Sequence, residues 1–136
     1  MKCIFCAIAE KQEPAEVIWE SDKVISFLDV NPMNFGHALV VPKEHFTDLT
    51  EIPGNLIPEL FQTAQKVAIA LVDVLQADGF NIVLNNGRAA GQSIFHSHIH
   101  VIPRFNEDNF QIQLHLKRYP EGELSRHGSI IRNRLL

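Results

Sequence analysis

The sequence Gly91-Gln92-Ser93-Ile94-Phe95-His96-Ser97-His98-Ile99-His100-Val101-Ile102-Pro103 places three histidines at alternate positions. In an extended backbone, successive side chains point to opposite faces, so His96, His98 and His100 would share one face of a strand. A buried imidazole needs hydrogen-bond partners and a fixed tautomer, which makes such a row costly unless it has a function. The row predicts either metal ligation by several imidazoles, or one imidazole acting as nucleophile while its neighbours bind the substrate.

A glycine-rich loop, residues 86–91, leads into the histidine run. Its small residues expose backbone N–H groups, and the Ser93 hydroxyl follows closely, a combination suited to binding phosphate. Because it lies next to the three histidines, this loop favours phosphate chemistry over metal ligation by the imidazoles. Asp29 and Asn31, at the end of an expected strand, could hydrogen-bond ribose hydroxyls. Phe27 and Val30 could enclose a base, although packing in an ordinary core is the simpler explanation for these two apolar residues.

The composition is that of one globular domain of 136 residues, with 46% hydrophobic and 21% charged residues. Twelve Lys and Arg residues against sixteen Asp and Glu residues give a net charge of -4, and no basic block predicts a groove for a nucleic acid polymer. A nucleotide partner would therefore be a small ligand. The first residues lack the apolar run of a signal peptide, and no segment reaches transmembrane length, so we expect a cytoplasmic protein with no membrane partner.

The two cysteines of the chain, Cys3 and Cys6, have C-x-x-C spacing. In a reducing compartment this spacing favours metal binding or redox exchange over a structural disulfide, and two free thiols are the alternative. A tetrahedral zinc ion would need two further ligands. His45 and His96 are the candidates, beside the histidines of the C-terminal tail.

Hydrophobic periodicity predicts an α+β fold. Apolar residues at three- and four-residue steps predict one long helix over residues 55–77, with Asn55 as N-cap, Pro58 in the first turn and Gly79 as C-cap. Five strands with mostly short connections indicate a largely antiparallel sheet. Apolar runs bounded by turn residues place these strands at residues 17–20, 24–29, 37–42 and 80–85 and at the histidine run.

Both ends of the chain are predicted to be helical. Residues 1–9 would form a short helical turn with Ile4, Phe5 and Ile8 facing inward. The tail would end in a helix that Gly128 breaks. Between this helix and the histidine run, Ile112, Leu114 and Leu116 alternate with polar residues.

The histidine run resembles the signature of the histidine-triad (HIT) superfamily, in which three histidines alternate with apolar residues, and is most similar to its Hint-like branch. Ser97 departs from this pattern, which has an apolar residue there, but it is expected on the face opposite the histidines. The resemblance covers residues 3–105, and the tail beyond Phe105 matches no part of it. Its further motifs are Phe27-Leu28-Asp29-Val30-Asn31-Pro32, Gly36-His37-Ala38-Leu39-Val40-Val41-Pro42-Lys43-Glu44-His45 and Asn85-Asn86-Gly87.

This resemblance implies a single HIT-like domain over residues 1–136, with a core at 1–105 and a variable tail at 106–136. The implied fold is a five-stranded, mainly antiparallel sheet with one long helix and a short C-terminal helix. The implied activity is that of a hydrolase or transferase acting at the α-phosphate of adenosine (purine) nucleoside phosphoramidates or dinucleoside polyphosphates. The reaction would pass through a nucleotidyl-histidine, in a homodimeric enzyme that needs no organic cofactor.

The resemblance also assigns residues to the site. His98 would be the nucleophile, His100 and Ser93 would hydrogen-bond the phosphate and the leaving group, and His37 would support the triad. The nucleotide would be held by the glycine-rich loop, by a carboxylate for the ribose and by apolar walls around the base. These binding residues are Asn85, Gly91, Gln92, Asp29, Phe5, Ile8, Phe27 and Val30.

Some HIT-like branches bind zinc, and the resemblance implies a structural zinc site formed by Cys3, Cys6, His45 and His96, with no role in catalysis. Two rival functions remain open. One is a zinc-dependent hydrolase that uses the three histidines of the run as ligands, which is disfavoured because alternate strand residues spread over more than ~6 Å. The other is a nucleotide-binding or interaction module with little turnover.

Overall fold

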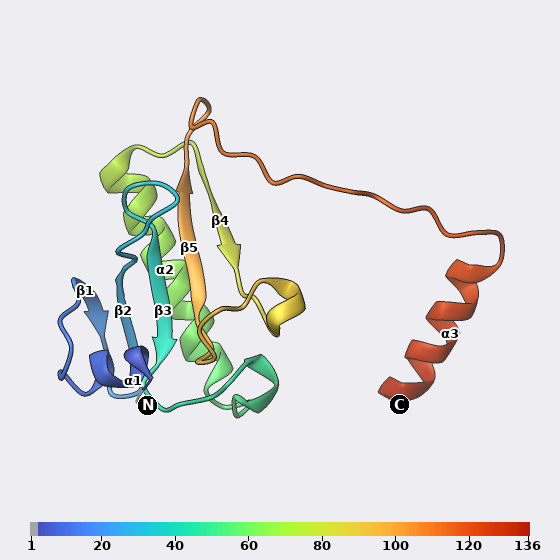
Figure 1. Cartoon of the computed structure of the whole chain (residues 1–136), viewed down its shortest axis with the longest axis horizontal. Helices are drawn as coiled ribbons and strands as arrows, with labels where there is room; N and C mark the ends of the chain where they lie inside the picture. The colour runs from blue at the N-terminus through green and yellow to red at the C-terminus, as the bar shows by residue number, and fades with distance from the viewer. Residues whose placement is uncertain (1–2) are drawn as a thin grey trace.

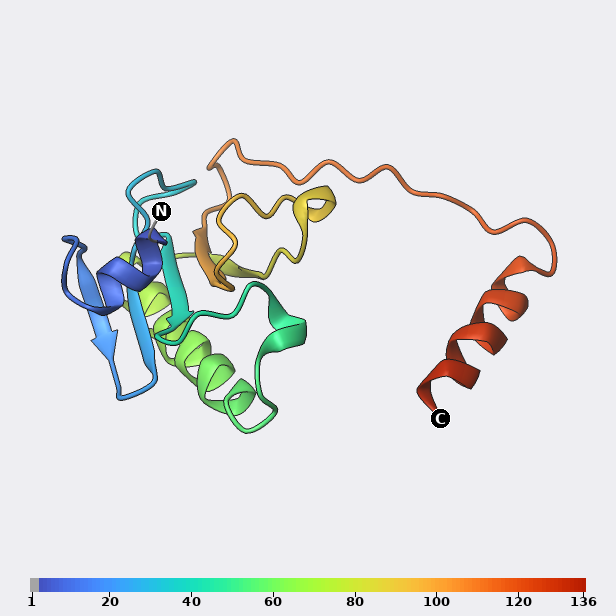
Figure 2. The same ribbon diagram turned by 60° about the horizontal axis from the view of Figure 1, so that its bottom comes forward.

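A computed structural model describes residues 3–136 of the chain. Its body is a five-stranded sheet with a long helix on one face and a short N-terminal helix on the other, and an extended segment leads away from this body to a last helix (Figures 1 and 2). No helix in this described part is long and apolar enough to cross a membrane. In chain order, the elements are α1 (Ile4–Ala9), β1 (Val17–Glu20), β2 (Val24–Leu28), β3 (Ala38–Pro42), the 3-10 helix η1 (Leu49–Glu51), α2 (Ile57–Leu75), β4 (Gly79–Val83), the 3-10 helix η2 (Arg88–Ala90), β5 (Ile99–Arg104) and α3 (Glu123–Leu135).

Neighbouring strands of the sheet are all antiparallel, in the order β1-β2-β3-β5-β4. This arrangement confirms the predicted α+β fold with five strands, one long helix and a C-terminal helix. The register places Phe27 opposite Leu39, and Leu39 opposite His100. Because residues directly opposite each other lie on the same face of a sheet, these side chains form a row across three strands. The row therefore places the apolar side chains of Phe27 and Leu39 next to His100 of the histidine run.

Two apolar clusters pack on the two faces of the sheet. The buried side of α2 repeats at three- and four-residue steps and packs on residues of β2, β3 and β5 that share one face. On the other face, Phe5 and Ile8 of α1 pack against Phe27 and Leu39. Since α1 has only six residues, it is held by this packing and not by its own hydrogen bonds. The α1 face therefore carries the row that ends at His100.

The ends of α2 differ from the prediction. The N-cap position is Leu56, which makes no side-chain hydrogen bond to the helix, so the predicted asparagine cap one residue earlier is wrong. Pro58 lies in the first turn as predicted, where its missing N–H is not needed. The C-cap is Gln76 in the left-handed region (φ 53), and Gly79 already starts β4. The chain turns back towards the sheet before it reaches the glycine.

The histidine run is not a strand throughout, because β5 begins only at Ile99. The two earlier histidines lie on the segment that leads into the strand. Within this segment, the N–H of Ser97 donates to the carbonyl of Phe46, 2.7 Å away, and not to a neighbouring strand. His96 and His98 are nevertheless both buried. Their positions therefore depend on the loop that follows β3 as well as on the sheet.

The terminal helices correct two smaller predictions. Phe5 and Ile8 of α1 are buried as predicted, but Ile4 is 44% exposed, because it borders an open cavity described below. At the other end, α3 runs through Gly128 without a break. A single glycine costs a helix only about 1 kcal/mol relative to alanine, which does not suffice to end it.

Candidate functional site

The backbone holds His98 in one tautomer. Its Nδ1 lies 2.7 Å from the carbonyl oxygen of His96. A carbonyl oxygen only accepts hydrogen bonds, so Nδ1 carries the proton and Nε2 of the neutral ring keeps its lone pair. His98 also lines a cavity. The result is a nucleophilic nitrogen on a ring that borders a space for a ligand.

A second chain of hydrogen bonds orients His100. The N–H of Met33 donates to Nδ1 of His37 over 3.1 Å, so the proton of neutral His37 is on Nε2. This Nε2 lies 2.9 Å from Nδ1 of His100 and donates to it. The proton of His100 is consequently on its own Nε2, where it is available as a donor. His37 thus contacts the triad through a direct hydrogen bond to its last member.

Burial keeps these imidazoles neutral. It lowers the pKa of His98 and of His37, although the carboxylate of Asp29 opposes the shift in both. Burial, with smaller contributions from His98 and His37, lowers the pKa of His100 to about 4. At neutral pH the tautomers derived above therefore hold, since they require uncharged rings.

The cavity beside these histidines has a volume of about 420 Å³, within the range of pockets that hold small ligands. Phe5 connects the apolar part of the cavity to the triad. The ring of Phe5 stands edge-on to the rings of Phe27 and His98, with centroid distances of 5.5 and 5.0 Å. Asp29 adds a carboxylate, one oxygen of which accepts the N–H of Asn31 over 2.8 Å. The lining residues are Ile4, Phe5, Ile8, Pro14, Ala15, Phe27, Leu28, Asp29, Val30, Asn31, Leu39, Ser93, Ile94, His98 and His100.

Three of the predicted nucleotide-binding residues, Asn85, Gly91 and Gln92, do not line this cavity. The side chain of Gln92 is buried and is used within the loop. It accepts the N–H of Gly87 over 2.8 Å and donates to two backbone carbonyls over 2.7 and 3.1 Å. In this structure Gln92 therefore shapes the glycine-rich loop that precedes Ser93.

The cavity also has lining residues that the sequence analysis missed. Leu39 and Ile94 both border it, whereas Val30, a predicted wall, is 87% exposed and covers it only in part. Leu39 belongs to an apolar strand, and such a residue has the same pattern whether it faces a core or a cavity. Ile94 lies inside the histidine run and next to Ser93, and this position in the sequence could have identified it as a lining residue.

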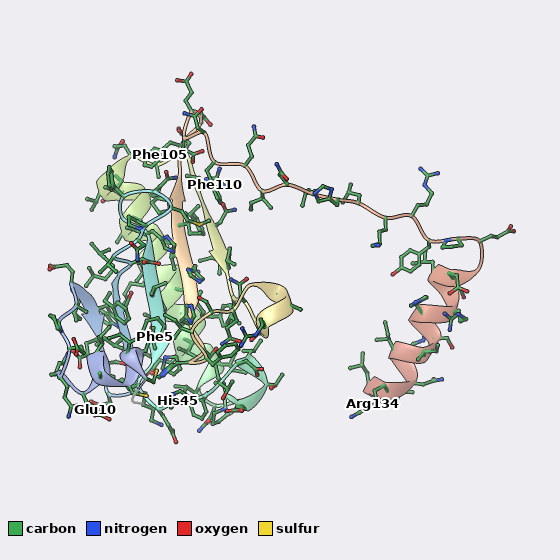
Figure 3. The ribbon with its side chains drawn as sticks, viewed as in Figure 1. Phe5, Glu10, His45, Phe105, Phe110 and Arg134 are labelled. Atoms are coloured by element: carbon green, nitrogen blue, oxygen red, sulfur yellow. The ribbon has the colours of Figure 1, made fainter. Side chains whose placement is uncertain are left out.

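Cys3, Cys6, His45 and His96 come together as predicted, although they are far apart in the sequence. Their four candidate ligand atoms all lie within 4.8 Å of one another. Nδ1 of His96 is 3.4 Å from Sγ of Cys3 and 3.5 Å from Sγ of Cys6, and Nδ1 of His45 is 3.3 Å from Sγ of Cys6. Figure 3 shows His45 near Phe5 of α1, at the end of the body opposite to Phe105 and Phe110.

These distances fit a tetrahedral zinc ion. Typical Zn–S and Zn–N bonds at a tetrahedral angle place S and N roughly 3.6 Å apart, close to the separations observed. The tautomer of His96 fits as well, because its Nε2 lies 2.8 Å from the carbonyl of Pro42 and donates to it, which leaves Nδ1 without a proton. Burial lowers the pKa of His96 to about 4, which favours the neutral ring that a metal requires.

The rival use of all three histidines as ligands of one ion does not agree with this geometry. His96 turns its Nδ1 to the cysteines, while the rings of His98 and His100 stand with centroids 4.8 Å apart. Asp29, His37 and His100 do form a second close group. There, however, Nε2 of His37 carries the proton that it donates to His100, so the group is a hydrogen-bonded chain.

The cluster of Cys3, Cys6, His45 and His96 shares structural parts with the histidine site. His96 contributes its ring to the cluster and its carbonyl oxygen to His98. Phe5 lies between the two cysteines on α1 and contacts the ring of His98. An ion held by the cluster would therefore fix both the α1 wall of the cavity and the carbonyl that selects the tautomer of His98.

Comparison with known proteins gives the family. The model of the HIT domain matches residues 10–107 of the chain. Adenylylsulfatase HINT3 from Arabidopsis thaliana is 36% identical over 136 residues, which cover 98% of this chain and 69% of that protein. The chain belongs to the HIT domain family.

Two solved structures extend this comparison. The crystal structure of a member of the HIT family of proteins from Bacillus subtilis has 34% identity and a TM-score of 0.91, and the match covers 100% of this chain and 99% of that chain. The structure of a zinc-bound histidine triad family protein from Mycobacterium smegmatis has 38% identity and a TM-score of 0.76, and covers 100% and 99%. The fold is therefore shared over the full chain.

Proposed function

We propose that the protein is a zinc-stabilised, homodimeric nucleotide hydrolase or transferase that cleaves a bond to the α-phosphorus of adenosine or other purine nucleotides. Nucleoside phosphoramidates and dinucleoside polyphosphates are the proposed substrates. The observation that carries this proposal is the tautomer of His98, because a neutral Nε2 with a free lone pair, on a ring that lines a cavity of about 420 Å³, is equipped for nucleophilic attack.

The proposed reaction has two displacements. In the first, the lone pair of His98 Nε2 attacks the α-phosphorus, an N–P bond forms, and the bond between phosphorus and the leaving group breaks. The Nε2–H of His100 is a donor for the phosphoryl oxygens or the leaving group, which needs a proton when it is an amine. In the second, water attacks the same phosphorus and the N–P bond breaks, so that His98 returns to its starting state, and the proton that water loses replaces the one that the leaving group took from His100.

The cavity supports a role for the predicted binding residues. Phe5, Ile8 and Phe27 would enclose the base. One oxygen of Asp29 accepts the N–H of Asn31, which leaves the other oxygen for ribose hydroxyls. Ser93 borders the cavity beside the triad and would donate its hydroxyl to the phosphate.

The glycine-rich loop would not bind the nucleotide with its backbone N–H groups, and its main role would be to position Ser93. The backbone N–H of Gly91 donates to Arg88, and that of Gln92 to Gly87, over 3.0 and 3.1 Å. Both groups are therefore engaged inside the loop. We assign Asn85, Gly91 and Gln92 to the support of Ser93, which would contact the nucleotide directly.

Zinc would have a structural role. Cys3, Cys6, His45 and His96 would hold it, and when bound it would supply a rigid link between α1 and the segment that enters β5. The zinc-bound relative from M. smegmatis supports this assignment. The name of the Arabidopsis relative, an adenylylsulfatase, adds a sulfate leaving group to those worth testing.

The proposal is tested by incubating the purified protein with adenosine 5′-phosphoramidate, a dinucleoside polyphosphate and adenylyl sulfate. We expect release of adenosine monophosphate from at least one of them, and acid-sensitive labelling of His98 by one nucleotidyl group in rapidly quenched samples. Binding of adenosine monophosphate without any turnover would favour the interaction module instead. Turnover that a chelator abolishes without unfolding the chain would favour the zinc hydrolase.

A further prediction concerns His37. His37→Ala removes the hydrogen bond to Nδ1 of His100 and leaves that buried acceptor unpaired, so the orientation of the donor at Nε2 is lost. We expect kcat to fall roughly 10- to 100-fold, with little change in the affinity for adenosine monophosphate. The matched control is His115→Ala, at an exposed histidine outside the site. Equal kcat values in the two variants would show that His37 does not position the triad.

A further inference from the structure

The hydrogen bond between His37 and His100 could form with its protons in either of two arrangements. In the arrangement derived above, Nε2 of His37 donates to Nδ1 of His100, and Nε2 of His100 is left as a donor. If both rings carried the proton on Nδ1 instead, Nδ1 of His100 would donate to Nε2 of His37 across the same 2.9 Å. Nε2 of His100 would then hold a lone pair, and the donor for the phosphoryl oxygens or the leaving group would be lost.

The backbone N–H of Met33 selects between the two arrangements. It lies 3.1 Å from Nδ1 of His37, and a backbone N–H can only donate. A proton on Nδ1 would face this N–H and leave both groups without an acceptor. The carboxylate of Asp29 acts in the same direction, because its Oδ2 lies 3.7 Å from Nε2 of His37 and favours a proton there. The proton of His100 therefore depends on the position of Met33.

Met33 belongs to the β2–β3 loop, whose side chains are mostly exposed. Met33 and Phe35 are 50% and 88% exposed, so neither attaches the loop to the body. Asn34, between them, is half-buried. Its carbonyl accepts the N–H of His37 over 3.0 Å, so Asn34 also forms the turn that brings the histidine back to Met33. The side chain of Asn34 is thus in a position to hold this part of the loop.

The strand that carries His100 holds Asn34. Nδ2 of Asn34 donates over 2.9 Å to the carbonyl of Pro103, which lies three residues after His100 on β5 (Figure 1). The histidine end of the loop is fixed separately, by close packing on α2. At Gly36 (φ +100) a Cβ would lie 2.5 Å from a methyl carbon of Leu75. Asn34 therefore ties the Met33 end of the loop to the same strand as the imidazole whose proton it controls.

The second acceptor of Asn34 is itself rigidly held. Nδ2 of Asn34 also donates to Oδ2 of Asp108 over 3.0 Å. The side chain of Asp108 is only 7% exposed. Its Oδ2 accepts from Nε of Arg104 over 2.8 Å and from the N–H of Phe105 over 3.0 Å. A buried carboxylate with this many donors stays in place, so it gives the asparagine a fixed partner.

From these contacts we propose that Asn34 is a positioning residue, which keeps the proton of His100 on Nε2 by holding the N–H of Met33 in place. The inference rests on the proposed function, because it concerns the donor that the proposed reaction uses. Asn34 is not among the residues that line the cavity, so it acts on the reaction only through the imidazoles. A loss of Asn34 should therefore change turnover and leave nucleotide binding as it is.

The matched variants are Asn34→Ala and Asn81→Ala. Both remove the side chain of a half-buried asparagine that bonds to the group of residues around Asp108. Asn81 accepts from Nη1 of Arg104 over 2.7 Å, on the β4 side. Both variants should lower Tm to a similar degree, since each leaves polar groups of the same cluster with one partner fewer. Only Asn34→Ala releases the loop that carries Met33.

The tautomers are measured directly by long-range ¹H–¹⁵N NMR of protein with ¹⁵N-labelled histidine, purified without chelator and kept at neutral pH. We expect Nε2 of His37 and His100 to carry the proton in the wild type and in Asn81→Ala. In Asn34→Ala both rings should shift towards protonation at Nδ1. Unchanged tautomers in folded Asn34→Ala would overturn the inference. Should that variant not fold, Asp108→Ala removes one of the two acceptors and must show the same shift.

Two further readouts separate this inference from the catalytic proposal. When the competent arrangement falls to about one tenth of the molecules, kcat falls about tenfold, and we expect this for Asn34→Ala relative to Asn81→Ala. The affinity for adenosine monophosphate should be equal in the two variants. Equal kcat values, or a wild type with the proton of His100 on Nδ1, would overturn the inference. A wild type with the expected tautomers and no turnover of any substrate would contradict the proposed reaction and leave the role of Asn34 intact.

Discussion

His98→Ala is expected to lower the turnover of adenosine phosphoramidate on the order of 10⁴-fold or more, while the chain still folds and binds the nucleotide. The methyl group of alanine has no lone pair, so the N–P bond of the intermediate cannot form. The apolar walls of the cavity are unchanged, and Phe5 and Phe27 continue to pack on each other. Steady-state release of adenosine monophosphate measures the loss, and calorimetry with adenosine monophosphate measures the binding that should remain.

The fold should survive this change. Without the ring, the carbonyl of His96 loses the donor that now lies 2.7 Å away, a cost of about 1–3 kcal/mol. This is less than the stability of a typical domain, about 5–15 kcal/mol. Thermal unfolding followed by circular dichroism checks the point, with His115→Ala as the matched histidine control. If His98→Ala kept its activity and a normal unfolding transition, a different group would be the nucleophile.

The second large effect concerns zinc. Protein purified without chelator should contain one zinc ion per chain, and His45→Ala should abolish this content. Free zinc at about a thousand times its dissociation constant stabilises the folded state by about 4 kcal/mol, so the loss should lower Tm by roughly 14 °C. Because Phe5 lies between the two cysteine ligands on α1, the affinity for adenosine monophosphate should also decrease. Metal analysis, thermal unfolding and calorimetry supply the three readouts.

The comparison of two exposed histidines makes this test specific. His45 and His115 are both exposed, so replacing either by alanine removes little packing. Only His45 lies in the cysteine cluster, with its Nδ1 3.3 Å from Sγ of Cys6. His115→Ala should therefore keep both its zinc and its Tm. If the wild-type protein lacked stoichiometric zinc, the zinc prediction would be wrong, and Cys3 and Cys6 would be thiols that hold no metal ion.

The main elements of the fold were predictable because each carries its own periodic pattern. The apolar stripe of α2, the hairpin of β1 and β2, and the strand β3 all appear in the sequence as spacings of two, three or four residues. Their ends were less predictable. Gln76 ends α2 in a left-handed conformation although glycine is the common residue there, because the chain must turn into β4 at that point.

The site was predictable in its residues and less so in its arrangement. Alternation along the run suggests three equivalent imidazoles on one face. In the structure they have three different partners: His96 faces the cysteines, His98 donates to a backbone carbonyl, and His100 accepts from His37. None of these partners is visible in the spacing of the run, because each comes from a segment that the fold brings in from elsewhere or from the backbone itself.

The sequence by itself determined the class of the fold, the family resemblance and the inventory of chemical groups, since periodicity and residue type are local properties. Only the tertiary structure decided which nitrogen of each histidine holds the proton, that four candidate ligand residues spread between Cys3 and His96 converge, and that the segment from residue 111 to residue 136 leads away from the body. These outcomes depend on distances between segments remote in the chain. Such distances are set by the packing of α1 and α2 on the sheet, which no local pattern encodes.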